Sequence, residues 1–145
     1  MPTEPVPAAR PRFSDEDYQA ILAFRTRIRQ FLAWSAAQAR AAGLTPAQHQ
    51  LLLAVRGHPE AGGPTIGQIA VYLQLRHHSA VGLVDRAEAA GLVRREVDAT
   101  DRRVARVQLQ PAGESALEGL TALHVAELRA LVSGDPLAHL SGIER

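Results

Sequence analysis

Residues 103–109, RVARVQL, alternate along the chain in a way that constrains the fold more than any other stretch of the sequence. Ala105, Val107 and Leu109 fall on one face of an extended segment, because successive side chains of a β-strand point to opposite sides. A second short run, LVRREV at 92–97, precedes this segment, and charged or turn-forming residues link the two. We therefore expect a two-stranded hairpin with a charged tip.

Helical segments precede and follow this hairpin. Three hydroxyl residues are each followed, three positions later, by a carboxylate or an amide, which is the spacing of a helix capping box. The three pairs are Ser14 and Asp17, Thr45 and Gln48, and Thr65 and Gln68. Together with the apolar periodicity, these starts predict helices over 14–42, 46–57, 65–75, 77–90 and 111–132. The chain is therefore expected to be mainly α-helical with one small β-hairpin.

The length and the two ends of the sequence limit the class of protein. A chain of 145 residues has room for one domain with a buried core. Residues 1–13 carry prolines at positions 2, 5, 7 and 11 and are expected to form a disordered tail, which leaves 14–145 as the folded domain. No stretch approaches the roughly 18 apolar residues of a membrane span, and no secretory signal precedes the tail. We expect a cytoplasmic protein without membrane contact.

The composition argues against an enzyme or a metalloprotein. The chain has no cysteine, which removes disulfides and zinc–thiolate sites. No glycine-rich phosphate loop, paired-carboxylate motif or activated serine is recognisable, so we expect neither catalysis nor a cofactor. His77 and His78 are adjacent and would point about 100° apart on a helix, which makes them a poor chelate. No metal site is expected there or at His49, His58, His124 and His139.

The order helix, turn, helix and hairpin is that of a winged helix-turn-helix. The run GLVRREVDATDRRVARVQLQPAG, residues 91–113, resembles the wing of the MarR family of regulators. LVDRAEAAGLV at 83–93 resembles the end of that family's recognition helix, and LTPAQHQLLLAV at 44–55 resembles its second helix. The wing positions that carry the resemblance are Asp101, Arg103, Val107, Leu109 and Gly113.

The resemblance covers roughly residues 14–132 and implies a function. It implies a homodimeric transcriptional regulator that binds a pseudo-palindromic operator in double-stranded DNA, with a DNA-binding lobe at about 45–110. Helices at about 14–42 and 111–145 would then form the dimer interface. It also suggests a repressor that a small, often aromatic or anionic effector releases. We expect Trp34 and His49 to line the effector site, although Trp34 equally suits a core or interface position.

The expected recognition helix offers DNA a surface with few hydrogen-bonding groups. Its apolar stripe, Ala80, Leu83, Val84, Ala87 and Ala90, faces inward. At its start, His77 and His78 can donate to phosphate or guanine, and Val81 can meet a thymine methyl group. Gly82 either lets the helix approach the bases closely or is a neutral surface substitution. The candidate DNA-binding residues are His77, His78, Ser79, Val81, Gly82, Arg86, Asp101, Arg102 and Arg103.

The arginine pair at the hairpin tip is the second part of the expected interface. Asp101 can orient one guanidinium of Arg102 and Arg103 by a charge-assisted bond, which leaves the other free to enter the minor groove. The alternative is a solvated turn without a partner. Arg86 and three further arginines are weaker candidates for phosphate contact, since each could pair with Glu88, Glu96 or Asp98 instead. These three are Arg94, Arg95 and Arg106.

The sequence also departs from the family pattern. Arg76, His77 and His78 stand at the start of the recognition helix, where hydroxyl residues are usual, and Gln110 replaces a usual threonine. The weakly polar recognition face keeps a second hypothesis open, a winged-helix protein-interaction module without specific DNA binding. Binding to DNA that falls steeply with salt would separate the two hypotheses, because phosphate contacts release counterions.

Overall fold

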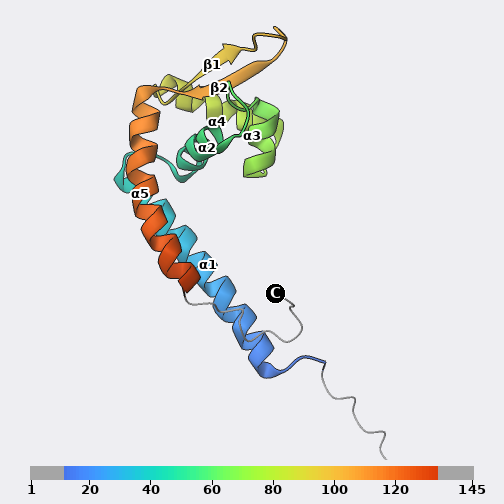
Figure 1. The fold of residues 1–145 in the computed structure, drawn as a ribbon, viewed down its shortest axis with the longest axis vertical. Coiled ribbons are helices and arrows are strands. Elements are labelled where there is room, and N and C mark those ends of the chain that lie inside the picture. The colour runs from blue at the N-terminus through green and yellow to red at the C-terminus, as the bar shows by residue number, and fades with distance from the viewer. Residues whose placement is uncertain (1–11, 134–145) are drawn as a thin grey trace, which may run out of the picture.

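The computed structural model describes residues 12–133, and the expected mainly α fold with one antiparallel hairpin is confirmed. Two long helices, α1 and α5, form a stalk, and the other elements form a lobe at one end of it (Figure 1). Residues 1–11 of the expected tail and the segment after Ser133 lie outside the described residues. The elements are α1 (Asp15–Ala41), α2 (Pro46–Gly57), α3 (Ile66–Leu73), α4 (His77–Ala89), β1 (Val93–Val97), β2 (Ala105–Leu109) and α5 (Pro111–Ser133).

The three predicted capping boxes are all present and explain where α1, α2 and α3 begin. In α2, the hydroxyl of Thr45 accepts from the backbone N–H of Gln48 at 3.1 Å, and the Gln48 side chain accepts from the backbone N–H of Thr45 at 3.0 Å. Thr65 and Gln68 repeat this pair of bonds at the start of α3. The helix starts are thus local properties of the sequence.

The hydrophobic core lies inside the lobe, between α2, α3, α4, the base of the hairpin and the first turns of α5. The predicted inward stripe of α4 is buried from Ala80 to Ala87, but the prediction for Ala90 is wrong, since this residue is exposed. The helix ends at Ala89, and Gly91 turns the chain with a positive φ of 75° toward β1. The largest fully buried side chains are Leu51, Leu52, Ile69, Val84, Val93, Val107 and Pro64.

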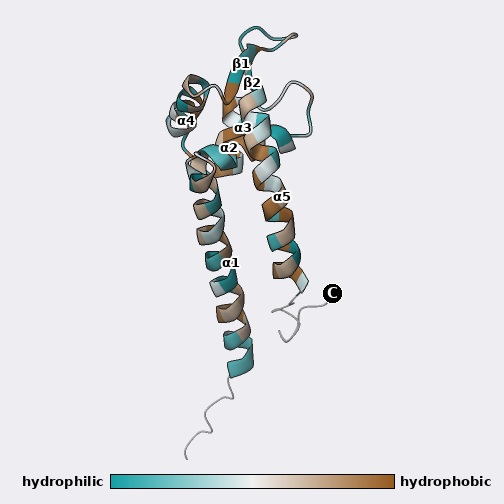
Figure 2. Ribbon diagram, turned by 90° about the vertical axis from the view of Figure 1, so that its left-hand side faces the viewer, coloured by the Kyte–Doolittle hydropathy of each residue, from teal (hydrophilic) through white to brown (hydrophobic). Residues whose placement is uncertain are grey.

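The hairpin is shorter than predicted. Val93 pairs with Leu109 at its base and Val97 with Ala105 at its outer end, so Leu92 and Arg103 lie outside the strands. The backbone N–H of Asp98 donates to the carbonyl of Val104 at 2.8 Å and closes a loop over 98–104. Arg103 therefore sits in the tip of the wing and not in its second strand. Figure 2 shows the outer loop as mostly hydrophilic, beyond a more hydrophobic base.

The stalk is incompletely covered within one chain. On α1, five large apolar residues are exposed: Tyr18, Ile21, Leu22, Ile28 and Leu32. On α5, Leu117 and Leu120 are buried near the lobe, whereas Leu123 and Leu128 are exposed farther along. None of the helices among residues 12–133 is long and apolar enough to cross a membrane.

Close backbone packing joins α5 to the hairpin. A Cβ atom at Gly113 would lie 2.1 Å from the carbonyl oxygen of Leu92 and 3.3 Å from Cδ2 of Leu52. The same carbonyl of Leu92 accepts from the backbone N–H of Gln110 at 2.9 Å. Only glycine permits this approach, so the first turn of α5 is pressed against the chain that enters β1.

We predict that Gly113→Ala lowers the free energy of unfolding by about 1–3 kcal/mol, because the added methyl group must displace backbone. Gly119→Ala is the matched control, since it lies on the same helix with open space around its Cβ position. That change should raise stability by about 0.5–1 kcal/mol through helix propensity. Urea unfolding followed by circular dichroism measures both, and equal effects of the two variants would contradict the close approach.

Candidate nucleic-acid interface

The start of α4 presents unpaired backbone donors to solvent. Its N-cap residue, Arg76, makes no side-chain capping bond, unlike Thr45 and Thr65 at α2 and α3. The first N–H groups of a helix have no partner within the helix, and the helix dipole places positive potential there. His77, His78 and Ser79 are all exposed around this end. The arrangement suits an anionic group such as a phosphate.

The outer face of α4 shows what surrounds Gly82, the glycine for which the sequence analysis left two explanations open. A Cβ atom at Gly82 would lie 3.2 Å from Nη1 of Arg86, so the missing side chain makes room for this guanidinium to lie along the helix. The guanidinium of Arg86 has no ion pair or hydrogen bond to the described residues. Val81 and Gly82 are half-buried beside it. The candidate residues of α4 therefore form a shallow surface with one unpaired cation.

Arg94 and Arg95, both on β1, pair with carboxylates of β1 and α4. Arg95 on β1 donates from its backbone to Glu88 at 2.7 Å and from its guanidinium to Glu88 at 2.9 Å and Asp85 at 2.5 Å. Arg94 pairs with Glu96 at 2.7 Å and donates to Gln108 at 2.9 Å. Arg95 thus ties β1 to α4 and neutralises two acids that would otherwise face the same side as the DNA-binding candidates.

The wing tip is organised by two aspartates. The carboxylate of Asp98 accepts from the backbone N–H groups of Thr100 at 2.8 Å and Asp101 at 3.0 Å. Asp101 in turn accepts from Nε and Nη2 of Arg103 at 3.1 Å and 3.2 Å, and from its backbone N–H at 3.0 Å. The side chain of Arg103 is nevertheless 90% exposed. Arg102 is exposed and has no bond to the described part of the chain.

The two aspartates remain ionised under ordinary conditions. A side-chain hydrogen bond from Arg106, followed by that from Thr100, holds the pKa of Asp98 well below its usual range. The bond from Arg103 lowers the pKa of Asp101 in the same way. Both carboxylates therefore keep their charge, and their arginine partners keep a fixed direction, at any pH near neutrality.

The wing and α4 lie at the same end of the molecule. Figures 1 and 2 both show the hairpin projecting from the lobe on the side away from the free ends of α1 and α5. The tip extends outward and is not folded back onto the stalk. The structure therefore places the α4 candidates and the wing candidates in one lobe. A large ligand such as a nucleic-acid duplex can contact both sets of residues there.

The two expected effector residues meet through a residue that the sequence analysis did not select. The ring of His124 on α5 lies 4.9 Å from that of Trp34 and 4.7 Å from that of His49, between ring centroids. Nδ1 of His124 donates to the carbonyl of Leu120 at 2.7 Å, which leaves Nε2 of a neutral ring to accept from Ser35 at 2.7 Å. Its spacing from Leu117 and Leu120 on the buried face was the available indication.

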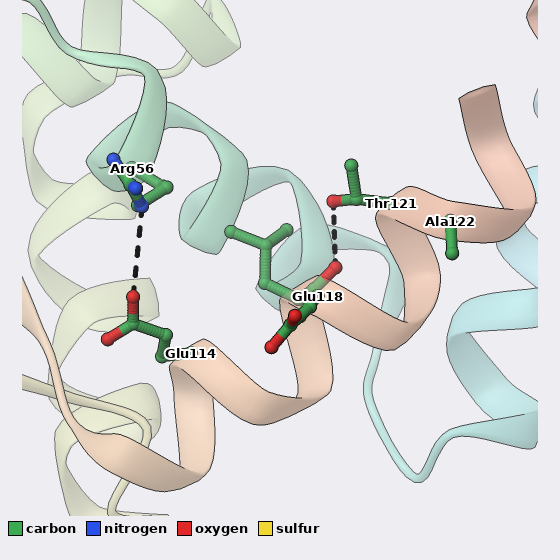
Figure 3. Close-up of a pocket in the computed structure, with 6 residues that line it drawn as sticks. Arg56, Glu114, Glu118, Thr121 and Ala122 are labelled. Atoms are coloured by element: carbon green, nitrogen blue, oxygen red, sulfur yellow. Dashed lines mark hydrogen bonds and ion pairs between the residues drawn. The ribbon is translucent and has the colours of Figure 1, made fainter.

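Two hollows lie along the stalk near this cluster. One, of about 360 Å³, is lined by Trp34 together with Arg27, Phe31 and Glu127, and His49 does not contribute to it. The other, of about 570 Å³, lies between the end of α2 and α5, where Arg56 faces Glu114 at 3.9 Å (Figure 3). Neither expected effector residue lines this second hollow. Trp34 and His49, which both contact His124, therefore join α1, α2 and α5 and do not together line either hollow.

No cluster of metal-binding side chains is found among residues 12–133. His77 and His78 are exposed at the start of α4, and the rings of His49 and His124 lie in contact, tilted by 57°, in the stalk joint. His58 instead pairs with the hydroxyl of Tyr72 at 2.8 Å. His139 lies outside the described residues.

Burial lowers the pKa of His49, and the nearby ring of His124 lowers it further. The folded chain then binds fewer protons at this site than the unfolded chain just below the ordinary value of 6.5. The contribution of His49 to stability is present above that pH and is lost as the pH falls. Acidification should therefore destabilise the packing of His49 in the joint between stalk and lobe.

We predict that the melting temperature of the wild type falls between pH 7.5 and pH 5.5, and that His49→Gln reduces this fall. His77→Gln is the control, because it replaces an exposed histidine at the start of α4, away from the joint between stalk and lobe. Thermal unfolding of the three proteins at several pH values decides the matter. A wild-type slope retained in His49→Gln would assign the effect to another group.

Comparison with known proteins agrees with this architecture. Residues 42–104 match the model of the MarR family. The Bacillus subtilis (strain 168) protein YsmB, an uncharacterized HTH-type transcriptional regulator, is 37% identical over 59 residues, which are 41% of this chain and 40% of YsmB. The match thus spans less than half the length of this curated relative.

Solved structures extend the similarity to the stalk. A MarR family transcriptional regulator from Silicibacter pomeroyi is 27% identical with a TM-score of 0.65, over 81% of this chain and 76% of the other. The MepR–DNA complex of Staphylococcus aureus is 25% identical with a TM-score of 0.68, over 83% and 85% of the two chains. The fold, the match over the lobe and these solved structures show that the chain is similar to regulators of the MarR family in both the lobe and the stalk.

Proposed function

We propose that this protein is a sequence-specific, double-stranded DNA-binding transcriptional regulator that acts as a homodimer. The observation that carries the proposal is the wing tip, where Asp101 holds the 90% exposed side chain of Arg103 by two side-chain hydrogen bonds. A guanidinium that is both aligned and accessible is suited to a narrow minor groove. The similarity to MepR, which has been solved in complex with DNA, supports the same role.

In this proposal, α4 enters the major groove while the wing reaches the flanking minor groove. The backbone N–H groups at the start of α4, with His77, His78 and Ser79, bind phosphate or base edges. Val81 and Gly82 allow a close approach to the bases. Arg86 supplies a positive charge along the same face. Since this surface has few donors, backbone contacts and DNA shape provide much of the affinity.

Dimerisation is proposed from the uncovered stalk. Apolar side chains of α1 and α5 remain exposed along most of both helices, and a contiguous apolar surface of this kind marks an interaction site. A second copy has the complementary face by symmetry. Pairing also places two recognition helices on one duplex, so that each reads half of a pseudo-palindromic operator.

Regulation by an effector is proposed at the joint of stalk and lobe. Trp34 lines the hollow of about 360 Å³ beside the joint and contacts the ring of His124, which in turn contacts His49. A small aromatic or anionic effector that binds in this hollow and displaces these rings would change the angle between α1, α2 and α5. Such a change would alter the distance between the two DNA-binding lobes of the dimer, so that they no longer fit the two half-sites and the operator is released. We propose a repressor of this kind, located in the cytoplasm and without enzymatic activity.

The DNA-binding proposal predicts that Arg103→Ala weakens operator binding by about 10- to 100-fold, the range for loss of a specific arginine contact. Arg94→Ala, which removes an equal charge from the same hairpin, should have a much smaller effect, because Arg94 is engaged with Glu96 and Gln108. Gel-shift titration on a duplex selected from the host genome measures both. Equal binding by wild type and Arg103→Ala would remove Arg103 from the interface.

The same titration over a range of salt concentrations tests the alternative. Affinity that falls linearly on a logarithmic scale with salt shows release of counterions from phosphates. Failure of the wild type to select any duplex would favour a protein-interaction module.

The dimer proposal predicts that Leu32→Glu converts the protein to a monomer at micromolar concentration, because a charge would be buried in the α1 interface. Leu53→Glu is the matched control, since both leucines are 54% exposed in the single chain but Leu53 lies on α2 in the lobe. Light scattering coupled to gel filtration gives the mass of each. A monomeric wild type would overturn the proposal.

A further inference from the structure

We infer that Arg106 is a positioning residue of the wing, which locks the hairpin onto the loop before α3 and so sets how far from α4 the tip arginines meet DNA. The inference rests on the proposed DNA binding and concerns a residue that makes no contact with the duplex itself. Arg106 differs from the other hairpin arginines in that its partners lie on two separate parts of the chain.

The contacts of Arg106 form a clasp, which we define as the side chains of Arg106, Asp98 and Glu60 with the backbone of Gly63. Its Nε donates to the Asp98 carboxylate in the wing, and its Nη1 donates to the carbonyl of Gly63 at 3.0 Å. Glu60 lies 3.7 Å from the same Nη1. The side chains of Arg106 and Asp98 are only 21% and 12% exposed. This partly shielded geometry is more rigid than that of an exposed ion pair.

Backbone contacts hold the same two segments together. The N–H of Val107 donates to the carbonyl of Pro64 at 2.9 Å, and the side chain of Gln108 donates to the carbonyl of Gly62 at 3.3 Å. A Cβ atom at Gly63 would lie 2.0 Å from the carbonyl oxygen of Val107, so no residue with a side chain fits between the loop and the strand. The loop continues directly into Thr65, the cap of α3.

Asp98 connects the clasp to the tip of the wing. One of its carboxylate oxygens binds Arg106, and the other accepts from the N–H groups of Thr100 and Asp101. Asp101 then aligns Arg103. A continuous series of bonds therefore runs from the loop before α3, through Arg106 and Asp98, to the guanidinium proposed to enter the minor groove. The wing and the helix-turn-helix should move as one body.

Arg94 provides an internal comparison. It lies on the same hairpin and is also paired, but its partners Glu96 and Gln108 both belong to the hairpin. Loss of Arg94 removes the same charge as loss of Arg106 without detaching the wing from the α3 loop. A difference in DNA binding between the Arg94 and Arg106 variants therefore reflects the contacts that each arginine makes and not the change in net charge.

The test is a double-mutant cycle on the full-length protein, with a duplex selected by the wild type. In the wild-type background, Arg103→Ala should weaken binding by about tenfold or more. In the Arg106→Met background the same change should cost only about two- to threefold, because Asp98 and the wing tip are no longer tied to the loop before α3 and hold Arg103 less firmly in the groove. In the Arg94→Met background the full effect should remain. An unchanged cost of Arg103→Ala in Arg106→Met would overturn the inference.

A measurement without DNA separates this inference from the proposed function. Hydrogen exchange at the N–H of Val107, which donates to Pro64, should become about tenfold faster in Arg106→Met and stay unchanged in Arg94→Met. Protection that is equal in all three proteins would overturn the clasp even if the wild type binds DNA. Faster exchange in a protein whose wild type binds no duplex would instead leave the clasp in place and refute the proposed function.

Arg106→Met is checked for folding by its melting temperature and far-ultraviolet circular dichroism. If that variant does not fold, Asp98→Asn takes its place, since it removes the charge opposite Arg106 and keeps the bond from Arg106 to Gly63. It should show the same direction of change in both measurements with a smaller magnitude. Wild-type behaviour of Asp98→Asn in both would also contradict the inference.

Discussion

The burial of the inner face of the hairpin is the interaction on which the rest of the structure depends. Val93 and Val107 are almost completely inaccessible and belong to the same core as Leu52, Val84 and Leu117. Their burial contributes several kcal/mol at about 25 cal/mol per Å² of apolar surface, which is more than exposed ion pairs supply. The wing is therefore anchored by its base. Its tip is free to carry charge without destabilising the lobe.

This anchoring explains how the chain distributes its arginines. Every one of the 16 basic residues is an arginine, so the sequence does not mark some of them as ligands and others as structural. The fold makes that distinction by distance to carboxylates. Arg95 and Arg106 lie close enough to acids to be immobilised, whereas Arg86 and Arg102 have no ion-pair partner in the described part of the chain. Immobilised arginines shape the surface, and unpaired or exposed ones remain available to an anion.

Local patterns predicted most of the fold, because capping boxes and strand alternation depend on residues only a few positions apart. They located the starts of α1, α2 and α3, the inward face of α4 as far as Ala87, and both strands to within two residues. They could not reveal that Gly82 leaves space beside Arg86, or which of the two tip arginines Asp101 would pair with, which is Arg103. Both depend on how side chains and hydrogen bonds settle after the backbone has formed.

Contacts between distant parts of the chain were beyond sequence reasoning for a different reason. Arg106 and Gly63 are separated by 43 positions, and Ser35 and His124 by 89. No periodicity within one helix or strand specifies such a pair. The candidate DNA-binding residues were accordingly easier to select than the residues that position them. The selected ones lie at a helix start and a turn, which are recognisable locally.

Long-range contacts made by α5 connect the lobe to the stalk. α5 begins where β2 ends, and its Gly113 touches the carbonyl of Leu92 at the entrance to β1. Farther along, α5 carries His124 into contact with Trp34 on α1 and His49 on α2. One rigid helix thus contacts the base of the wing and the stalk joint. Because close-packed interfaces do not deform continuously, a change in the angle of α5 at the joint must shift the hairpin as well. The stalk and the wing are therefore mechanically coupled through the direct contact of α5 with the base of the hairpin.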